Sequence, residues 1–100
     1  MPDPRLHPIT VSLDVAVGVT DASATISVAN DRRRDLEIVN DGDVVVYVSR
    51  TNPAVAGAGM RLNPYGGSYS MDSQNFYLGA FYAVCALGED GLLTISEGSG

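Results

Sequence analysis

Apolar and polar residues alternate with a period of two near the start of the chain. The apolar positions are Ile9, Val11, Leu13, Val15, Val17 and Val19. Mostly small or polar residues stand between them. Because successive side chains of a β-strand point to opposite faces, this pattern predicts a strand over residues 9–19 with one face in a core and the other turned outward.

Shorter stretches of the same period follow. They predict strands around Ile26 and around Leu36 and Ile38. The segment Asn40-Asp41-Gly42-Asp43 is rich in residues that tolerate turn conformations. It connects the strand around Ile38 to the apolar run 44–48, and the two segments together predict a β-hairpin.

The second half of the chain continues with short apolar segments between turns. We expect a loop over 51–59, then apolar anchors at Met60 and Leu62, and then a turn over 63–67. A short edge strand over 68–71 should follow. We expect a strand pair or a central strand within 76–87 and a last strand over 92–96.

No segment has the period of an amphipathic helix, and seven or eight short strands are typical of a β-sandwich or a small barrel. A chain of 100 residues is long enough for one domain. We therefore expect an all-β fold: a single small antiparallel β-sandwich, jelly-roll or Greek-key like, over residues 9–97. Residues 98–100 are expected to form a flexible tail.

Residues 1–8 contain three prolines, which fix their own φ and favour extended neighbours. This composition predicts an extended N-terminal arm that lies on a partner or on a neighbouring subunit. Arg5 and His7 would supply hydrogen-bond donors there. The arm residues that we select as interface candidates are Pro4, Arg5, Leu6, His7 and Pro8.

The charge balance is acidic, at −6, and all six basic residues are arginines. An acidic surface repels phosphate backbones and anionic lipids, so we expect neither a nucleic-acid nor a membrane partner. Arg32, Arg33 and Arg34 are consecutive and flanked by Asp31 and Asp35. They form either an anion-binding site or a solvated turn whose charges are neutralised by the neighbouring acids, and we favour the turn.

Few residues are suited to catalysis. The only histidine, His7, lies in the proline-rich segment, and the only cysteine, Cys85, has apolar neighbours. An activated thiolate needs cationic neighbours and partial exposure, so the sequence predicts that Cys85 is a small buried apolar residue. A single cysteine excludes an intramolecular disulfide. We expect no catalytic residues.

Metal ligands are equally sparse. One histidine and one cysteine make no zinc set. Asp41 and Asp43 flank Gly42, and Asp-x-Asp can bind Ca²⁺ when further oxygens converge, but a hairpin turn is the favoured interpretation. We expect no metal and no cofactor. Among the tyrosines, Tyr65 and Tyr69 lie near turns and are the candidates for a surface pair that binds a partner.

Three segments carry a resemblance to a known class of proteins. They are Arg34-x-Leu36-x-Ile38-x-Asn40 leading into Val46-Tyr47-Val48, Gly59-Met60-x-Leu62-x-Pro64 leading into Gly66-Gly67-Ser68-Tyr69, and Phe81-Tyr82-Ala83-Val84-Cys85-Ala86 with a last strand ending in Ser96-Glu97. Together they resemble small structural proteins of tailed bacteriophages, including head-decoration, cement and head-fibre proteins. The likeness extends from Arg34 to Glu97.

The resemblance implies a β-sandwich or jelly-roll-like protein on the capsid surface of a virion, assembled in the host cytoplasm and commonly trimeric. Its partners would be the major capsid protein and copies of itself, and it implies no catalytic residues. The expected function is a decoration or cement protein that stabilises the head. The alternative is a carbohydrate- or receptor-binding module of a fibre or host-attachment protein, with Tyr65 and Tyr69 on its binding face. The start of the chain has no pattern of a secretory signal, in keeping with assembly in a cytosol.

Overall fold

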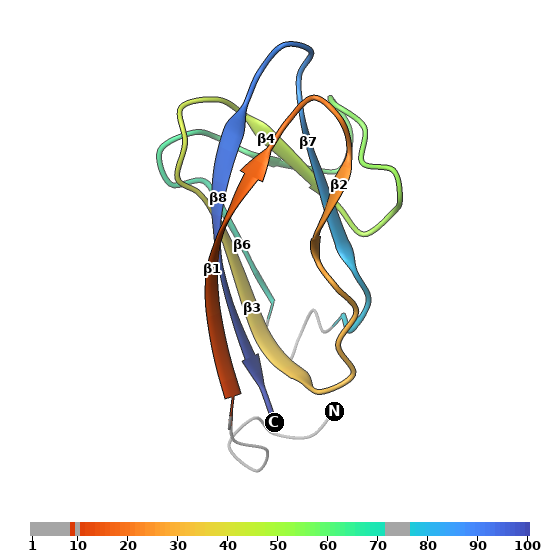
Figure 1. The fold of residues 1–100 in the computed structure, drawn as a ribbon, viewed down its shortest axis with the longest axis vertical. Coiled ribbons are helices and arrows are strands. Elements are labelled where there is room, and N and C mark those ends of the chain that lie inside the picture. Colours follow the sequence, from red (N-terminus) through yellow and green to blue (C-terminus); the bar gives the residue numbers. More distant parts are fainter. Residues whose placement is uncertain (1–8, 10, 72–76) are drawn as a thin grey trace.

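The computed structural model describes residues 9, 11–71 and 77–100, and these form two antiparallel four-stranded sheets packed face to face (Figure 1). The strands are β1 (Val11–Val19), β2 (Ala24–Ser27), β3 (Arg33–Asn40), β4 (Val46–Ser49), β5 (Met60–Leu62), β6 (Ser68–Met71), β7 (Phe81–Cys85) and β8 (Gly91–Ser99). Within the described ranges there is no helix that could cross a membrane.

The strand order identifies the topology. One sheet, sheet A, has the order β1-β8-β3-β6, and the other, sheet B, has the order β2-β7-β4-β5. The first strand pairs with the last, the second with the seventh, the third with the sixth and the fourth with the fifth, always antiparallel. One long antiparallel ribbon gives this order when it is wrapped over itself, and the result is a jelly roll. The predicted fold class is confirmed.

The predicted hairpin between β3 and β4 is wrong, because the two strands lie in different sheets. The turn after Asn40 carries the chain from sheet A to sheet B. Asn40 is fully buried, and its side-chain amide donates hydrogen bonds to the carbonyls of Val44 (2.7 Å) and Leu62 (2.9 Å). Its side-chain oxygen accepts one from the backbone of Gly42 (3.0 Å). These bonds direct the chain across the sandwich rather than back along the same sheet.

The core lies where the two sheets overlap. Its side chains alternate along strands of both sheets, as half-buried strands require. The most completely buried apolar members are Leu36, Ile38, Val46, Val48, Met71, Phe81, Ala83, Cys85 and Leu93. Strand β7 supplies three of these residues and lies between β2 and β4, so the central-strand alternative for this segment is correct.

The two sheets differ in length. In sheet A, β1 and β8 have nine residues and β3 has eight, whereas the strands of sheet B have three to five. Sheet A therefore extends past sheet B at the end where β1 begins and β8 finishes, which is the lower end in Figure 1. The described segments that precede β3 and β7 meet the buried Arg33 of β3 there.

The end of the chain corrects one expectation. Gly98 and Ser99 belong to β8 and do not form a flexible tail. The Gly98 amide donates to the Asp35 carboxylate (2.8 Å), and the Gly100 amide donates to the Arg32 carbonyl (2.9 Å).

The expected loop over 51–59 and the edge strand over 68–71 are confirmed. The expected arm over residues 1–8 lies outside the described residues.

Candidate interaction surface

The first half of β1 is apolar yet exposed. Its inner-face residues Val11, Leu13 and Val15 are 61%, 54% and 37% exposed, and full burial is reached only at Val19. The prediction that one face of this strand lies in a core is therefore wrong for its first half. The reason is the length mismatch, because the four residues of β2 are too few to cover a nine-residue strand.

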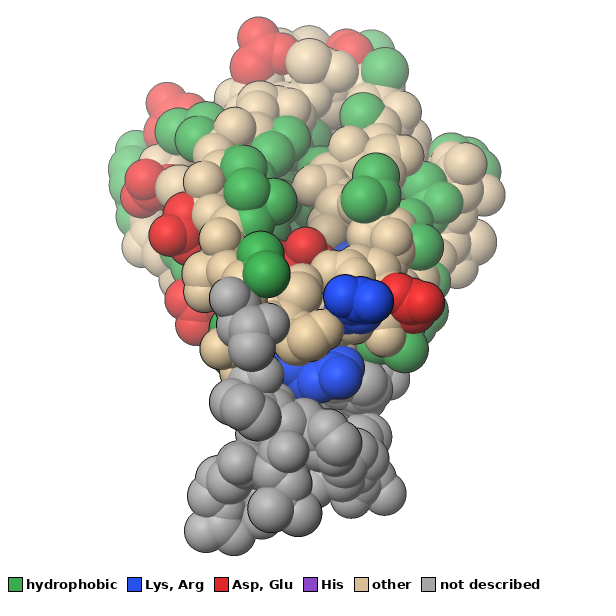
Figure 2. Space-filling model, turned by 60° about the horizontal axis from the view of Figure 1, so that its bottom comes forward, with side chains coloured by type: hydrophobic (Ala, Val, Ile, Leu, Met, Phe, Trp, Pro, Cys, Tyr) green, Lys and Arg blue, Asp and Glu red, His purple; other side chains and the backbone are tan. Residues whose placement is uncertain are grey.

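A groove runs between this part of β1 and the edge of sheet B. Its volume is about 210 Å³. It is lined by Leu13, Val15, Ile26, Ser27, Val28, Ile95 and Glu97. Val28, on the β2 side, is 72% exposed. Figure 2 shows apolar side chains on both sides of a hollow at this end of the molecule. The exposed apolar residues of β1 along this groove, Val11, Leu13 and Val15, are called the apolar strip below.

Among the described residues, strand β1 is also an open sheet edge, since it stands last in sheet A. Over nine residues it has no proline, and Asp14 is its only charged residue. The other three edge strands are shorter: β2 and β6 have four residues and β5 has three, and β2 also has an irregular register between Thr25 and Ser27. Long, uninterrupted apolar edges are the ones that recruit further strands, because they present free backbone donors and acceptors.

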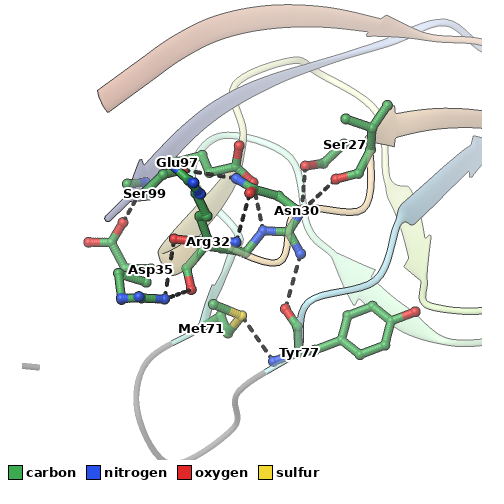
Figure 3. Close-up of polar contacts among 12 residues, drawn as sticks. Ser27, Asn30, Arg32, Asp35, Met71, Tyr77, Glu97 and Ser99 are labelled. Carbon is green, nitrogen blue, oxygen red and sulfur yellow. Dashed lines mark hydrogen bonds and ion pairs between the residues drawn. The ribbon is translucent and has the colours of Figure 1, made fainter. Parts of the chain in front are cut away.

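The lower part of the sandwich is closed by Arg33, which is completely buried. Its Nε donates to the Glu97 carboxylate at 2.6 Å. Its terminal nitrogens donate to four further oxygens: the carbonyls of Tyr77, Gly79 and Val28 and the hydroxyl of Ser27. All five donors of the guanidinium group are thus used. Figure 3 shows Ser27, Tyr77 and Glu97 converging at this network.

This arrangement corrects the interpretation of the arginine triplet as a solvated turn. Only Arg32 is exposed, while Arg33 joins β3, β8 and the segments before β3 and β7. A bulge between Arg33 and Asp35 shifts the alternation, so Arg33 points inward although it is out of phase with Leu36. Sequence reasoning missed both Arg33 and Glu97. The one available signal was that Glu97 stands at the next position in the inward alternation of Leu93 and Ile95.

The two tyrosines selected from the sequence do not form a pair on one surface. Tyr65 is 81% exposed and has a positive φ of 61° in the turn before β6. Tyr69 is half-buried on the inner face of β6, with its ring centroid 5.7 Å from that of Phe81. The guanidinium of Arg50 lies 5.6 Å from the Tyr69 ring. Tyr69 therefore borders the core, and Tyr65 alone has the exposure expected of a binding residue.

The other interface candidates, Pro4, Arg5, Leu6, His7 and Pro8, lie outside the described residues. Ile9 is described and is 44% exposed. It lies close over Gly98 of β8, where a Cβ atom would stand only 2.7 Å from the Ile9 side chain. Gly98 pairs with Ser12, whose side chain points away from the side of Leu13, so Ile9 lies on the other face of sheet A from the apolar strip.

Cys85 is buried, as predicted, at 1% exposure. Burial, with smaller contributions from Glu89 and Asp90, raises the pKa of its thiol above the ordinary value. A raised pKa disfavours the thiolate that a nucleophile needs.

We expect Cys85→Ala to lower the free energy of unfolding by about 1–3 kcal/mol through the void that it leaves. The raised pKa adds a pH dependence: above the ordinary thiol pKa the unfolded chain loses this proton first, so stability falls as pH rises. Cys85→Ala should lack that component in urea titrations at alkaline pH. Rapid labelling of the native thiol by a thiol reagent at neutral pH would contradict the burial.

Acidic residues do not assemble into a metal site in the part of the chain that is described. No three His, Cys, Asp or Glu side chains lie together there. Asp41 and Asp43 occupy the crossing between the sheets, next to the buried Asn40 that holds it. The segment is a turn, but it crosses between the sheets and does not form the hairpin that the sequence favoured.

The outer face of sheet A carries a second hollow, of about 300 Å³, which crosses β1, β8 and β3. Asp14, Ser96 and Glu37 stand side by side across it in the strand register. The Ser96 hydroxyl donates to Asp14 at 2.7 Å. The hollow therefore offers carboxylates and hydroxyls, without an aromatic ring among its lining residues.

Comparison with known proteins adds no relative. No family model, no curated protein and no solved structure matches this chain.

Proposed function

We propose that this protein is a non-enzymatic structural protein that binds other protein surfaces, as a decoration or cement protein of a bacteriophage head. The observation that carries the proposal is the apolar strip on β1. A jelly roll that completes its own core has no need of three exposed aliphatic residues beside a groove, and contiguous exposed apolar surface on a small domain marks an interaction site.

The fold is compatible with this role but does not assign it. Jelly rolls occur in viral capsid and lectin domains, and one fold serves many functions. The assignment to a virion rests on the resemblance of residues 34–97 to phage structural proteins. The proposed partners are the major capsid protein and further copies of this chain.

The most polar buried groups support a structural role. Arg33 donates to Glu97 and to backbone carbonyls, and Asn40 donates to backbone carbonyls; both join segments that are distant in sequence. Cys85 is a buried thiol with a raised pKa. Each is placed to hold the fold together.

Deletion of residues 1–8 tests the part that the proposal gives to the expected N-terminal arm. We expect the truncated chain to stay folded, because the core residues all lie between Val19 and Ile95. We expect it to lose part of its binding to capsids or to its own copies. Thermal melting, native mass and co-sedimentation with capsids measure these properties. A truncated chain that melts far lower yet still associates fully would show that the segment belongs to the fold, against our proposal.

One observation favours a second candidate function, a carbohydrate-binding module. The hollow on the outer face of sheet A places Asp14, Glu37 and Ser96 in one row, and such groups bind sugar hydroxyls. A glycan panel screened with the protein and with Glu37→Ala distinguishes the candidates. Binding lost in Glu37→Ala would favour the module over the decoration protein.

A further inference from the structure

We infer that β1 pairs antiparallel with β1 of a second copy about a two-fold axis at Leu13, joining the two A sheets into one continuous sheet. The inference deepens the proposed function, since it rests on the same apolar strip and names its occupant. It replaces the trimer implied by the resemblance with a two-fold pair.

The register follows from the alternation along β1. In an antiparallel pair, residues directly opposite each other point to the same face. An axis that passes through a residue therefore keeps the apolar row of both copies on one side, whereas an axis between two residues would set apolar against polar. Among residue-centred axes, the one at Leu13 brings all three exposed residues together. Leu13 then faces Leu13 of the second copy, and each Val11 faces a Val15.

The same register suits the polar side of the strand. It places each Ser12 opposite the Asp14 of the other copy. The hydroxyl of each Ser12 can then donate to that carboxylate, which gives one hydrogen bond on each side of the axis. Asp14 is the only charged residue of the strand, and in this register it faces Ser12 of the second copy and not the second Asp14. A chain of net charge −6 repels its copies, and the first half of β1 brings only one acid of each copy, Asp14, to the contact.

An added strand also covers the groove. Neighbouring strands lie about 4.8 Å apart, and the added row of Val and Leu side chains would project on the same side as the first. That side faces Ile26 and Val28 across the groove. The second copy thus supplies the apolar cover that β2 is too short to give.

The other sheet edges fit a second copy less well. Strands β2, β5 and β6 have at most four residues. A two-fold contact uses the same patch on both copies, so it needs one edge that is both long and self-complementary. Among the described edges, β1 meets both conditions.

Single cysteines in a Cys85→Ala background test the register. Residues opposite each other in an antiparallel pair have Cα atoms about 4.5–5.5 Å apart, inside the range of a disulfide. We expect Leu13→Cys to form a covalent dimer on mild oxidation, and Val11→Cys or Val15→Cys alone to stay monomeric on denaturing gels. A mixture of Val11→Cys and Val15→Cys protein should cross-link. The inference would be overturned if Val15→Cys protein cross-linked with itself, or if none of the three variants cross-linked.

A charge variant tests the interface without oxidation. The native protein should show twice its 10.5 kDa chain mass. Leu13→Arg should reduce this mass to one chain with its β-sheet circular dichroism unchanged. Leu87→Arg is the matched control, because Leu87 is 93% exposed in the segment between β7 and β8. It makes the same charge change and should leave the dimer intact. A native protein that is monomeric or trimeric at all concentrations overturns the pairing.

Capsid co-sedimentation separates this inference from the proposed function. A native dimer that binds no capsid leaves the pairing standing and contradicts the decoration role. A native protein that binds capsids and never dimerises supports the decoration role and contradicts the pairing.

Discussion

Arg33→Ala is expected to lower the free energy of unfolding by about 3–5 kcal/mol, because it leaves the Glu97 carboxylate inside the sandwich without its cation. The Glu97 side chain is only 13% exposed, and its Oε2 lies 2.6 Å from Nε of Arg33. The substitution also removes donors from three backbone carbonyls, at Val28, Tyr77 and Gly79. A domain of this size has about 5–15 kcal/mol in total, so the loss shows directly in a urea midpoint.

The arginine triplet supplies its own control. Arg32→Ala removes the same charge one residue away, at an exposed side chain, and should change stability by no more than about 0.5 kcal/mol. A double-mutant cycle with Glu97→Ala should show coupling, since the two residues are in contact. Equal destabilisation by Arg32→Ala and Arg33→Ala would contradict the assigned role.

The Arg33→Met, Glu97→Leu double variant separates the ion pair from the backbone bonds. Apolar replacement of a buried ion pair is often neutral or stabilising when the pair is all that is lost. Here the carbonyls of Val28, Tyr77 and Gly79 would also lose their donors. We therefore expect the double variant to remain less stable than the native protein.

The strands of this fold could be predicted because their signal is local. Alternation over residues 11–19 and around Ile26 and Ile38 depends on a few adjacent side chains, and all three strands are present. The partner of each strand depends on distant segments. The turn at Asn40–Asp43 is real, but whether it leads back along one sheet or across to the other is decided by Asn40, whose amide reaches Leu62, 22 residues later.

The candidate surface was beyond sequence reasoning for a similar reason. Whether Val11, Leu13 and Val15 are covered depends on the length of β2 and on the register of β1 with β8, neither of which is encoded in the alternation itself. The inward position of Arg33 depends on a bulge, and a bulge moves the alternation by one residue without changing composition. Both features bear on the lower end of the sandwich, where the sheets differ in length.

Phe81→Ala is expected to cost about 3–5 kcal/mol, as large buried aromatic residues do when truncated. The Phe81 side chain is completely buried in the first position of β7. Its ring centroid lies 5.2 Å from Tyr77 and 5.7 Å from Tyr69, and 5.3 Å from the Arg33 guanidinium. The ring thus joins the apolar core to the polar closure of the lower end.

Tyr82→Ala is the matched control on the same strand, since Tyr82 is adjacent, aromatic and only half-buried. It should cost about 1 kcal/mol, the range of strand propensities. Phe81→Leu keeps most of the side-chain volume, so it should lose less of the free energy of unfolding than Phe81→Ala. The leucine variant therefore gives a measurable comparison where the alanine variant does not fold. Because Phe81 lies away from the β1 edge, folded Phe81→Leu should retain the native mass. A difference of less than about 1 kcal/mol between Phe81→Ala and Tyr82→Ala in urea unfolding would show that the ring does not join the two parts of the interior.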